Sequence, residues 1–208
     1  MRKAFDTIPF DLLLKKLEFY GVHDNSLDWF KSYLTGRQQC VEINGIKSNN
    51  LTVKMGVPQG SILGPLLFLL FINDLPNCLT KSTPVLFADD TTVIKSGTDI
   101  KDLYRDMNYE LENLEQWCKV NKLSLNAKKT KYILFKPKKY HIHFEKLNFG
   151  GEEIERIGEN CKVTAFKFLG HWVDDNLNWD FHTNKLLNKL NSTNYILAKL
   201  KNKFPLAV

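Results

Sequence analysis

Two adjacent carboxylates interrupt a β-prone stretch of this chain and restrict how it can fold. Asp89 and Asp90 follow the apolar residues 85–88 and precede the β-branched residues 91–94. Neighbouring side chains of an extended strand point to opposite faces, and a buried charge must be paired or bound to a metal ion. We therefore predict two strands joined by a tight turn, with both carboxylates brought together at its tip.

Paired carboxylates at such a turn suit a hard divalent cation. Magnesium and manganese ions prefer oxygen ligands, so Asp89 and Asp90 are our candidate catalytic residues and metal ligands for Mg²⁺ or Mn²⁺. Turns in general also favour aspartate, and an isolated Asp-Asp pair is most simply explained as a solvated turn. Other features of the chain must decide between these two explanations.

A loop rich in glycine and proline comes before this predicted hairpin. Residues 56–61 read Gly-Val-Pro-Gln-Gly-Ser and lead into an apolar segment that ends near Leu75. Glycine lets the backbone approach a ligand closely, and the amide of Gln59 offers both a hydrogen-bond donor and an acceptor. The segment 61–75 is apolar almost all round, so we expect a buried helix. Taken alone, the loop is better explained as a turn that caps this helix.

The spacing of apolar residues predicts the remaining elements. Apolar residues recur every three or four positions from Ile100 to Cys118, which indicates an amphipathic helix capped by Thr98 or Asp99. Asn44-Gly45 between β-prone residues predicts a hairpin. Further elements are expected as helices at residues 9–20, at 26–34 with Asn25 or Ser26 as cap, and from about His182, and as short strands between 141 and 172.

Positive charge is concentrated in one stretch of the chain. The formal net charge of +6 is too modest to identify a nucleic-acid-binding protein. Between Glu115 and Glu145, however, there is no acidic residue and there are eight lysines, namely Lys119, Lys122, Lys128, Lys129, Lys131, Lys136, Lys138 and Lys139. Such a stretch attracts phosphates, although a solvated lysine face explains it equally well.

Cysteine usage and hydropathy suggest an intracellular protein without a membrane partner. The 4 cysteines lie far apart and form no C-x-x-C pair, which argues against zinc and against a disulfide framework. The longest apolar run, residues 62–72, contains Gly64 and Pro65 and is shorter than the roughly 20 residues that a membrane span needs. Neither the choice between nucleus and cytoplasm nor the oligomeric state follows from the sequence.

Five blocks occur in a fixed order along the chain. They are Lys3-Ala4-Phe5-Asp6, residues 56–75, Phe87-Ala88-Asp89-Asp90, residues 121–130, and Phe168-Leu169-Gly170. In this order and at this spacing, the blocks resemble those of reverse transcriptases of non-LTR retrotransposons, most closely the jockey-type group found in animals. The resemblance covers residues 1 to about 182.

The resemblance implies a role for individual residues. Asp89 would be the principal catalytic metal ligand with Asp90 as its neighbour, and Phe5 would pack under the incoming sugar and disfavour a 2′-hydroxyl. The other implied contacts are Pro58, Gln59 and Gly60 with nucleotide and template, Lys129 with the triphosphate, and Phe168, Leu169 and Gly170 with the primer end.

The resemblance also implies a fold and a set of partners. The fold would be α+β, with a palm whose antiparallel sheet carries helices on one face, the start of a helical thumb, and no fingers. We expect a palm core at residues 1–139, a β-rich primer-grip region at 140–180 and the first thumb helix at 181–208. The implied activity is that of an RNA-directed DNA polymerase, a nucleotidyltransferase, acting on an RNA template, a DNA primer and dNTPs.

One carboxylate of the family pattern falls outside this sequence. The family's first block reads Asp, two variable residues, Lys, Ala, Phe, Asp, so the catalytic Asp would stand immediately before Met1. Asp6 is the second Asp of that block. We therefore expect little or no polymerase activity from this chain alone. A non-catalytic nucleic-acid-binding remnant of the same element is the alternative, whereas a metal-dependent phosphohydrolase would leave the loop around Gln59 unexplained.

Overall fold

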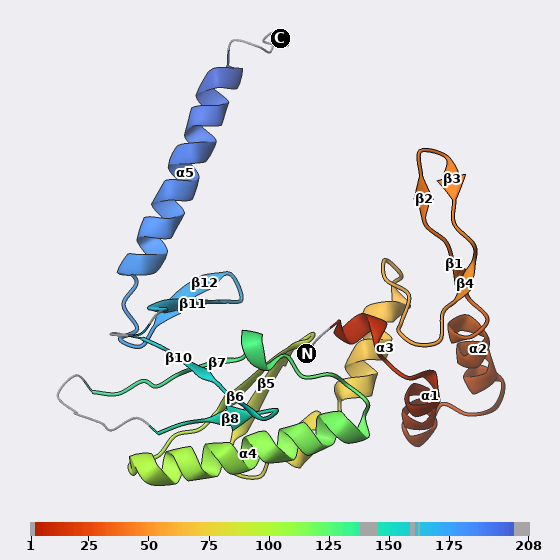
Figure 1. The fold of residues 1–208 in the computed structure, drawn as a ribbon, viewed down its shortest axis with the longest axis horizontal. Helices are drawn as coiled ribbons and strands as arrows, with labels where there is room; N and C mark the ends of the chain where they lie inside the picture. The colour runs from red at the N-terminus through yellow and green to blue at the C-terminus, as the bar shows by residue number, and fades with distance from the viewer. Residues whose placement is uncertain (1–2, 138–144, 159–160, 162, 202–208) are drawn as a thin grey trace. The chain divides into compact units, whose positions relative to one another are not determined.

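The structure is a computed structural model that describes residues 3–137, 145–158, 161 and 163–201 (Figure 1). The chain divides into two compact units, of which the first comprises Met1–Lys128 with Phe144–Glu153 and the second Lys129–His143 with Ile154–Val208. Helices and strands occur in both units, which confirms the expected mixed fold. No described helix combines the length and the apolar character that crossing a bilayer requires.

The first unit contains most of the helices. Its helical elements are η1 (Ala4–Asp6), α1 (Phe10–Phe19), α2 (Asp24–Leu34), α3 (Leu63–Ile72), η2 (Leu75–Cys78) and α4 (Ile100–Val120), and η3 (Ala127–Lys129) crosses into the second unit. Its strands are β1 (Gln38–Gln39), β2 (Glu42–Ile43), β3 (Ile46–Lys47), β4 (Leu51–Thr52), β5 (Thr83–Phe87), β6 (Asp90–Ile94), β8 (Asn148–Phe149) and β9 (Glu152–Glu153).

Local sequence signals placed several of these elements correctly. Asn44 and Gly45 connect β2 and β3, as predicted, and both residues have positive φ. Asp99 caps α4 by accepting hydrogen bonds from the N–H groups of Lys101 and Asp102 at 2.8 and 3.0 Å. The predicted cap of α2 was wrong, because that helix begins at Asp24 and its N-cap is His23, whose side chain makes no capping hydrogen bond.

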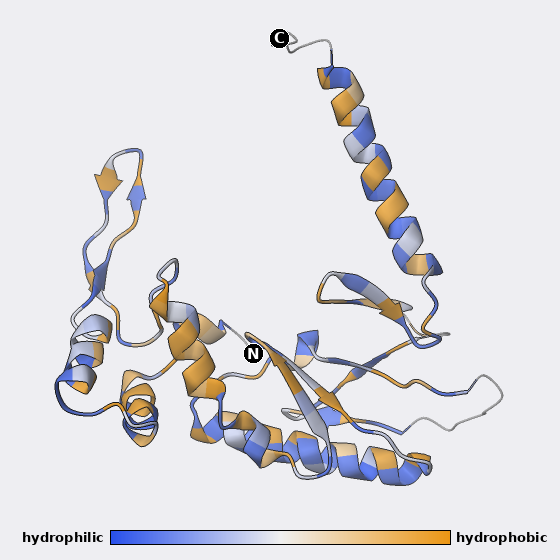
Figure 2. Cartoon of the chain, turned by 180° about the vertical axis from the view of Figure 1, so that it is seen from behind, coloured by the Kyte–Doolittle hydropathy of each residue, from blue (hydrophilic) through white to orange (hydrophobic). Residues whose placement is uncertain are grey.

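The core of the first unit lies where α1 and α3 contact each other. Leu13 and Leu17 of α1 and Phe68 and Phe71 of α3 are fully buried. The expectation that α3 is buried on all sides was wrong, because Leu66 and Leu69 are each 49% exposed. The side of α3 seen in Figure 2 is mainly apolar, and its sequence is apolar throughout, yet only one side of the helix faces α1 and η1.

The second unit holds two small sheets and the last helix. Its elements are β7 (Lys131–Ile133), β10 (Glu155–Ile157), β11 (Ala165–Phe168), β12 (His171–Asp174) and α5 (Asp180–Leu200). Strands β7 and β10 pair in parallel, whereas β11 and β12 form an antiparallel hairpin. Helix α5 contacts β12, where the N–H of Trp172 donates to Nδ1 of His182 at 3.3 Å.

The free cysteines Cys40 and Cys118 differ in burial and should therefore differ in reactivity. Cys118 of α4 is 1% exposed, and burial raises the pKa of its thiol to about 12, whereas Cys40 is exposed. The thiolate is the reacting form, so we expect a disulfide reagent at about pH 8 to modify Cys40 rapidly and Cys118 only after unfolding. Peptide mass spectrometry of timed samples would measure both rates, and equal rates in the folded chain would contradict the burial of Cys118.

Candidate active site

The 3₁₀ turn η1 and the loop at residues 56–64 are held together through their backbones. The N–H of Val57 donates to the carbonyl of Phe5, and the N–H of Gly56 donates to the carbonyl of Ile8, each at 2.8 Å. Gly56 has a φ of +88°, and a Cβ at this position would lie 2.7–2.8 Å from backbone atoms of Asp6. Glycine is therefore required for this approach. We call residues 4–8 and 56–64 together the turn–loop clamp.

The loop half of the clamp is closed onto the start of α3. The hydroxyl of Ser61 donates to the carbonyl of Pro58 at 2.7 Å and accepts from the N–H of Gly64 at 2.9 Å. A Cβ on Gly64 would lie 2.5 Å from the carbonyl oxygen of Pro58. The loop thus caps the helix, as the sequence indicated, and its shape depends on glycine at two points.

An arginine that the sequence did not single out fastens the loop from the other side. Nη2 of Arg37 donates to the carbonyl of Gly56 at 2.6 Å, and Nε donates to the carbonyl of Leu34 at 2.9 Å. The same guanidinium lies 5.6 Å from the ring centroid of Phe10. Arg37 therefore joins the end of α2, the start of α1 and the clamp, and the sequence carries no local signal for this role.

The clamp presents two of the predicted nucleotide-binding side chains together. The ring of Phe5 stacks on that of Phe68, with centroids 4.4 Å apart and planes inclined by 26°. Nε2 of Gln59 donates to Oδ1 of Asp6 at 2.6 Å. Phe5 is half-buried and packs against the core of the first unit, whereas Gln59 and Asp6 are exposed.

The predicted strand–turn–strand around the paired carboxylates is confirmed. Phe87 pairs with Asp90, so Ala88 and Asp89 form a two-residue turn between β5 and β6. Asp89 is half-buried and Asp90 is exposed. On the inner face Leu86 packs against the same core cluster as Phe5, which ties the hairpin and the clamp to one core.

The turn itself is strained. Ala88 has a φ of +50°, a region that residues with a Cβ occupy at a cost of about 1–2 kcal/mol. Strained backbone of this kind persists only where the surroundings enforce it, and it gathers at functional sites. Two-residue hairpin turns normally require a positive φ, and Asn44 in the β2–β3 turn has the same value of +50°, so this strain follows from the turn type and does not decide between a functional and a solvated turn.

The carboxylate pair fits part of a magnesium site. Magnesium is commonly held by one or two carboxylates, with waters and substrate phosphates completing its six oxygen ligands. Asp89 and Asp90 supply two carboxylates at adjacent positions of the hairpin, one in its turn and one at the start of β6. In the part of the chain that the structure describes, no three His, Cys, Asp or Glu side chains are grouped so that they could share an ion.

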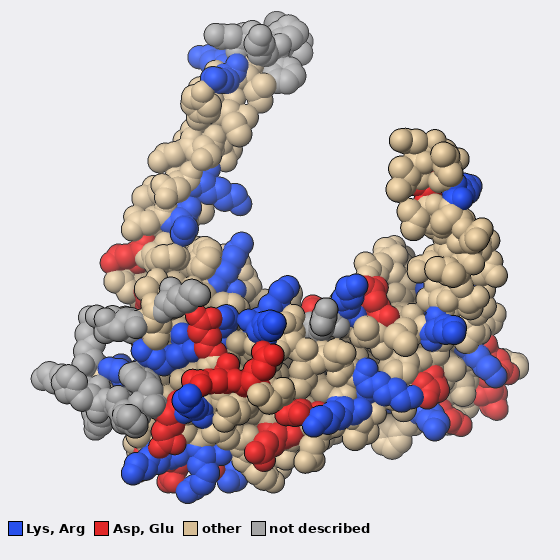
Figure 3. All heavy atoms as spheres, in the orientation of Figure 1, with Lys and Arg blue, Asp and Glu red and all other residues tan. Residues whose placement is uncertain are grey.

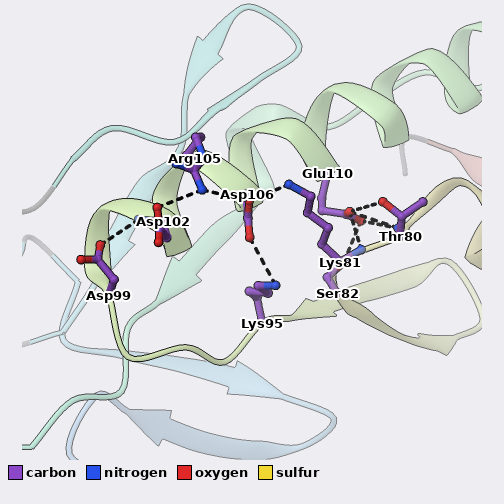
Figure 4. A network of polar contacts seen from close by, with 9 residues as sticks. All are labelled: Thr80, Lys81, Ser82, Lys95, Asp99, Asp102, Arg105, Asp106 and Glu110. Carbon is purple, nitrogen blue, oxygen red and sulfur yellow. Dashed lines mark hydrogen bonds and ion pairs between the residues drawn. The ribbon is translucent and has the colours of Figure 1, made fainter.

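A buried carboxylate on α4 anchors the start of the hairpin (Figure 4). Glu110 is 1% exposed and accepts hydrogen bonds from the N–H groups of Thr80 and Lys81 at 3.0 and 2.7 Å and from the hydroxyl of Ser82 at 2.8 Å. Burial alone would raise the pKa of Glu110, but the hydrogen bonds from Ser82, Lys81 and Thr80 outweigh it and leave the pKa lowered. This contact fixes the three residues that lead into β5.

Asp106, one helical turn before Glu110, holds both ends of the hairpin. Its carboxylate lies 2.8 Å from Nζ of Lys81, which precedes β5, and 3.4 Å from Nζ of Lys95, which follows β6. The hydrogen bond from Lys81 is the main reason why the pKa of Asp106 is lowered.

The sequence offered a partial signal for the role of Glu110, because Glu110 is an acid within the apolar stripe of α4 formed by Met107, Leu111 and Leu114.

The remaining predicted site residues belong to the second unit. Lys129 ends η3 and is exposed. Phe168 ends β11, and Leu169 and Gly170, with φ of +44° and +96°, form the tight turn to β12. Phe168 and Leu169 are 36% and 44% exposed, so this turn presents apolar side chains to its surroundings.

The lysine-rich stretch is less uniform than the sequence suggested. Lys119, Lys122 and Lys131 form ion pairs with Glu115, Asp11 and Glu155. Lys138 and Lys139 lie outside the described residues. On the face of the molecule in Figure 3, basic and acidic side chains are interspersed over the first unit, whereas α5 is mostly uncharged and its charged residues are three lysines and Asp180.

Comparison with known proteins connects these features to one family. Residues 1–173 match the family described as "Reverse transcriptase (RNA-dependent DNA polymerase)". The "Probable RNA-directed DNA polymerase from transposon BS" of Drosophila melanogaster is 34% identical in an alignment of 143 residues that covers 62% of this chain and 15% of the relative.

Two further relatives come from the same organism. The "RNA-directed DNA polymerase from mobile element jockey" is 29% identical over 163 residues, covering 73% of this chain and 16% of the relative. The "Probable RNA-directed DNA polymerase from transposon X-element" is 27% identical over 206 residues, covering 91% of this chain and 20% of the relative. The chain thus spans at most a fifth of the length of these three relatives.

Proposed function

Because the chain belongs to the reverse transcriptase family, we propose that it forms the catalytic core segment of an RNA-directed DNA polymerase of a jockey-type non-LTR retrotransposon. Its partners would be an RNA template, a DNA primer and dNTPs. The observation that carries the proposal is the common core under Phe5 and Leu86, which joins the nucleotide-binding clamp to the Asp89-Asp90 hairpin. A non-catalytic nucleic-acid-binding remnant is the second candidate, favoured by the lysine-rich stretch.

The proposed palm corresponds to residues 1–139, with the β5–β6 hairpin and helices α3 and α4 as its main parts. Residues 140–180 would be the primer-grip region, with its tip at Phe168, Leu169 and Gly170. Residues 181–208 would begin the thumb. The family match ends at residue 173, shortly before α5 begins at Asp180, which supports only the last of these boundaries.

In this proposal each side chain has a task that its surroundings suit. Asp89 and Asp90 would hold Mg²⁺ or Mn²⁺, which supplies positive charge to the phosphates and favours deprotonation of the primer hydroxyl. Phe5, stacked on Phe68, would form a firm floor beneath the sugar of the incoming nucleotide and leave no room for a 2′-hydroxyl. Pro58, Gln59 and Gly60 would contact nucleotide and template. The positive charge of Lys129 would offset the negative charge of the triphosphate.

Metal binding tests the proposal directly. A carboxylate about 4 Å from a divalent ion in water contributes about 2 kcal/mol, so we expect Asp89→Asn to weaken Mn²⁺ binding roughly thirtyfold. Electron paramagnetic resonance of free Mn²⁺ at increasing protein concentration would measure the change. Asp28→Asn is the matched control, because Asp28 is an exposed acid of α2 and its loss should leave the affinity unchanged.

The outcomes separate the two candidate functions. Equal Mn²⁺ affinity in the wild type and Asp89→Asn would exclude a catalytic metal site at this turn and favour the remnant. Primer extension on an RNA template gives an independent readout, for which we expect little or no product from this chain alone. Clear extension that disappears in Asp89→Ala would overturn the expected inactivity and establish the polymerase.

A further inference from the structure

The contact between Asp6 and Gln59 has a chemical consequence for substrate recognition. Nε2 of Gln59 lies 2.6 Å from Oδ1 of Asp6, although the two residues are 53 positions apart. An ionised carboxylate only accepts hydrogen bonds, so the amide must turn its NH₂ group toward Asp6. The amide oxygen of Gln59 then points away from Asp6. A glutamine without such a neighbour could present either end of its amide.

The backbone of the clamp makes this contact more than a chance meeting of two exposed side chains. Gly56 approaches Asp6 so closely that a Cβ would lie 2.7 Å from the Asp6 carbonyl oxygen. The hydrogen bonds to Phe5 and Ile8 flank Asp6 on both sides and fix the loop over it. The position of Asp6 beneath Gln59 is thus set by main-chain geometry, and only side-chain rotation remains for the hydrogen bond to restrict.

We propose that Asp6 is a positioning residue that fixes the amide of Gln59 so that its oxygen accepts a hydrogen bond from the nucleic acid or nucleotide. This inference rests on the proposed function of the clamp and makes it more specific. The group recognised by Gln59 would be a donor, such as a hydroxyl of a sugar or an amino group of a base. Asp6 would act only through Gln59 and would not touch the substrate itself.

A double-mutant cycle on the 208-residue chain tests this role. Fluorescence anisotropy would measure affinity for an RNA–DNA primer–template in the presence of the matching dNTP. We expect Asp6→Ala to weaken binding about fivefold, which is the size of one ordinary hydrogen bond. In the Gln59→Met background, Asp6→Ala should have no further effect. Asp6→Asn should fall between the wild type and Asp6→Ala, because asparagine can also accept from the amide.

A second measurement separates failure of this inference from failure of the proposed function. In NMR spectra, the NH₂ protons of Gln59, assigned by their loss in Gln59→Met, should exchange with water about fivefold faster in Asp6→Ala than in the wild type. Equal exchange, or equal effects of Asp6→Ala in both backgrounds, would overturn the positioning role. If the wild-type chain binds no primer–template but Asp6→Ala still speeds the exchange of the Gln59 amide, the proposed function would be refuted. The contact between Asp6 and Gln59 would still be established.

Discussion

Replacing Glu110 with alanine is expected to lower the free energy of unfolding by about 3 kcal/mol, because the change removes a buried carboxylate that accepts hydrogen bonds from three neighbouring residues. The N–H groups of Thr80 and Lys81 and the hydroxyl of Ser82 all donate to this carboxylate, which is 1% exposed. A hydrogen bond to a charged group contributes about 1.5–3 kcal/mol, and water can replace part of this at donors that are only partly buried, so the expected loss still exceeds that of an ordinary surface substitution. Urea unfolding at neutral pH would measure it.

Glu112→Ala is the matched control for this variant. Glu112 lies on the same helix but is exposed, so its replacement should change stability by no more than about 0.5 kcal/mol. The residues that Glu110 holds lead directly into β5 and from there to the turn at Asp89, so Glu110 also bears on the site. Equal stability of the two variants would show that the Glu110 contacts do not hold the hairpin.

The contribution of Glu110 should also depend on pH in a defined direction. Its hydrogen bonds leave its pKa in the folded chain below the ordinary value of 4.5. A group with a lowered folded-state pKa stabilises the fold fully above the unfolded-state value and loses this contribution as the pH falls through the folded-state value. The stability gap between the wild type and Glu110→Gln should therefore be widest near neutral pH and narrow below 4.5.

The elements that the sequence predicted well depend on neighbouring residues. The hairpin around Asp89 follows from a polar pair between two β-prone segments, and α4 follows from its apolar period and its Asp99 cap. The order and spacing of the five blocks also indicated the family, which the match over residues 1–173 bears out. The roles of single site residues, from Asp89 to Lys129, stay predictions, because they depend on contacts with substrate and metal rather than on the packing of the chain itself.

The features that the sequence did not reveal join residues far apart in the chain. Arg37 binds the carbonyl of Gly56, Gln59 binds Asp6, and Glu110 binds residues thirty positions earlier. The partners in these pairs leave no periodic or local trace, because each pairing depends on how helices and loops pack; only the position of Glu110 within the apolar stripe of α4 gave a partial signal. The error over α3 has a similar origin, since its composition indicates burial but only packing decides which side is covered.

Gly56→Ala should produce the second large effect, a loss of about 3 kcal/mol of stability. Alanine at a positive φ costs about 1–2 kcal/mol, and here the new Cβ would also collide with the backbone of Asp6 at 2.7–2.8 Å. Backbone atoms cannot rotate away as a side chain can. The loop must therefore move off η1, which breaks the hydrogen bonds to Phe5 and Ile8 at about 0.5–1.5 kcal/mol each.

Gly45→Ala separates the collision from the backbone strain. Gly45 has a φ of +80°, close to that of Gly56, but a Cβ there would meet nothing within 4 Å, so only the cost of about 1–2 kcal/mol should appear. Urea unfolding of both variants measures the difference, and Gln59 amide exchange at a temperature where Gly56→Ala is still folded reports whether the clamp has opened. A Gly56→Ala chain as stable as Gly45→Ala, with unchanged exchange, would show that the close approach to Asp6 does not hold the clamp. Loss of stability together with faster exchange would instead establish Gly56 as the residue that keeps Gln59 against Asp6. The orientation of the Gln59 amide oxygen, the proposed hydrogen-bond acceptor, would then depend on the backbone at Gly56.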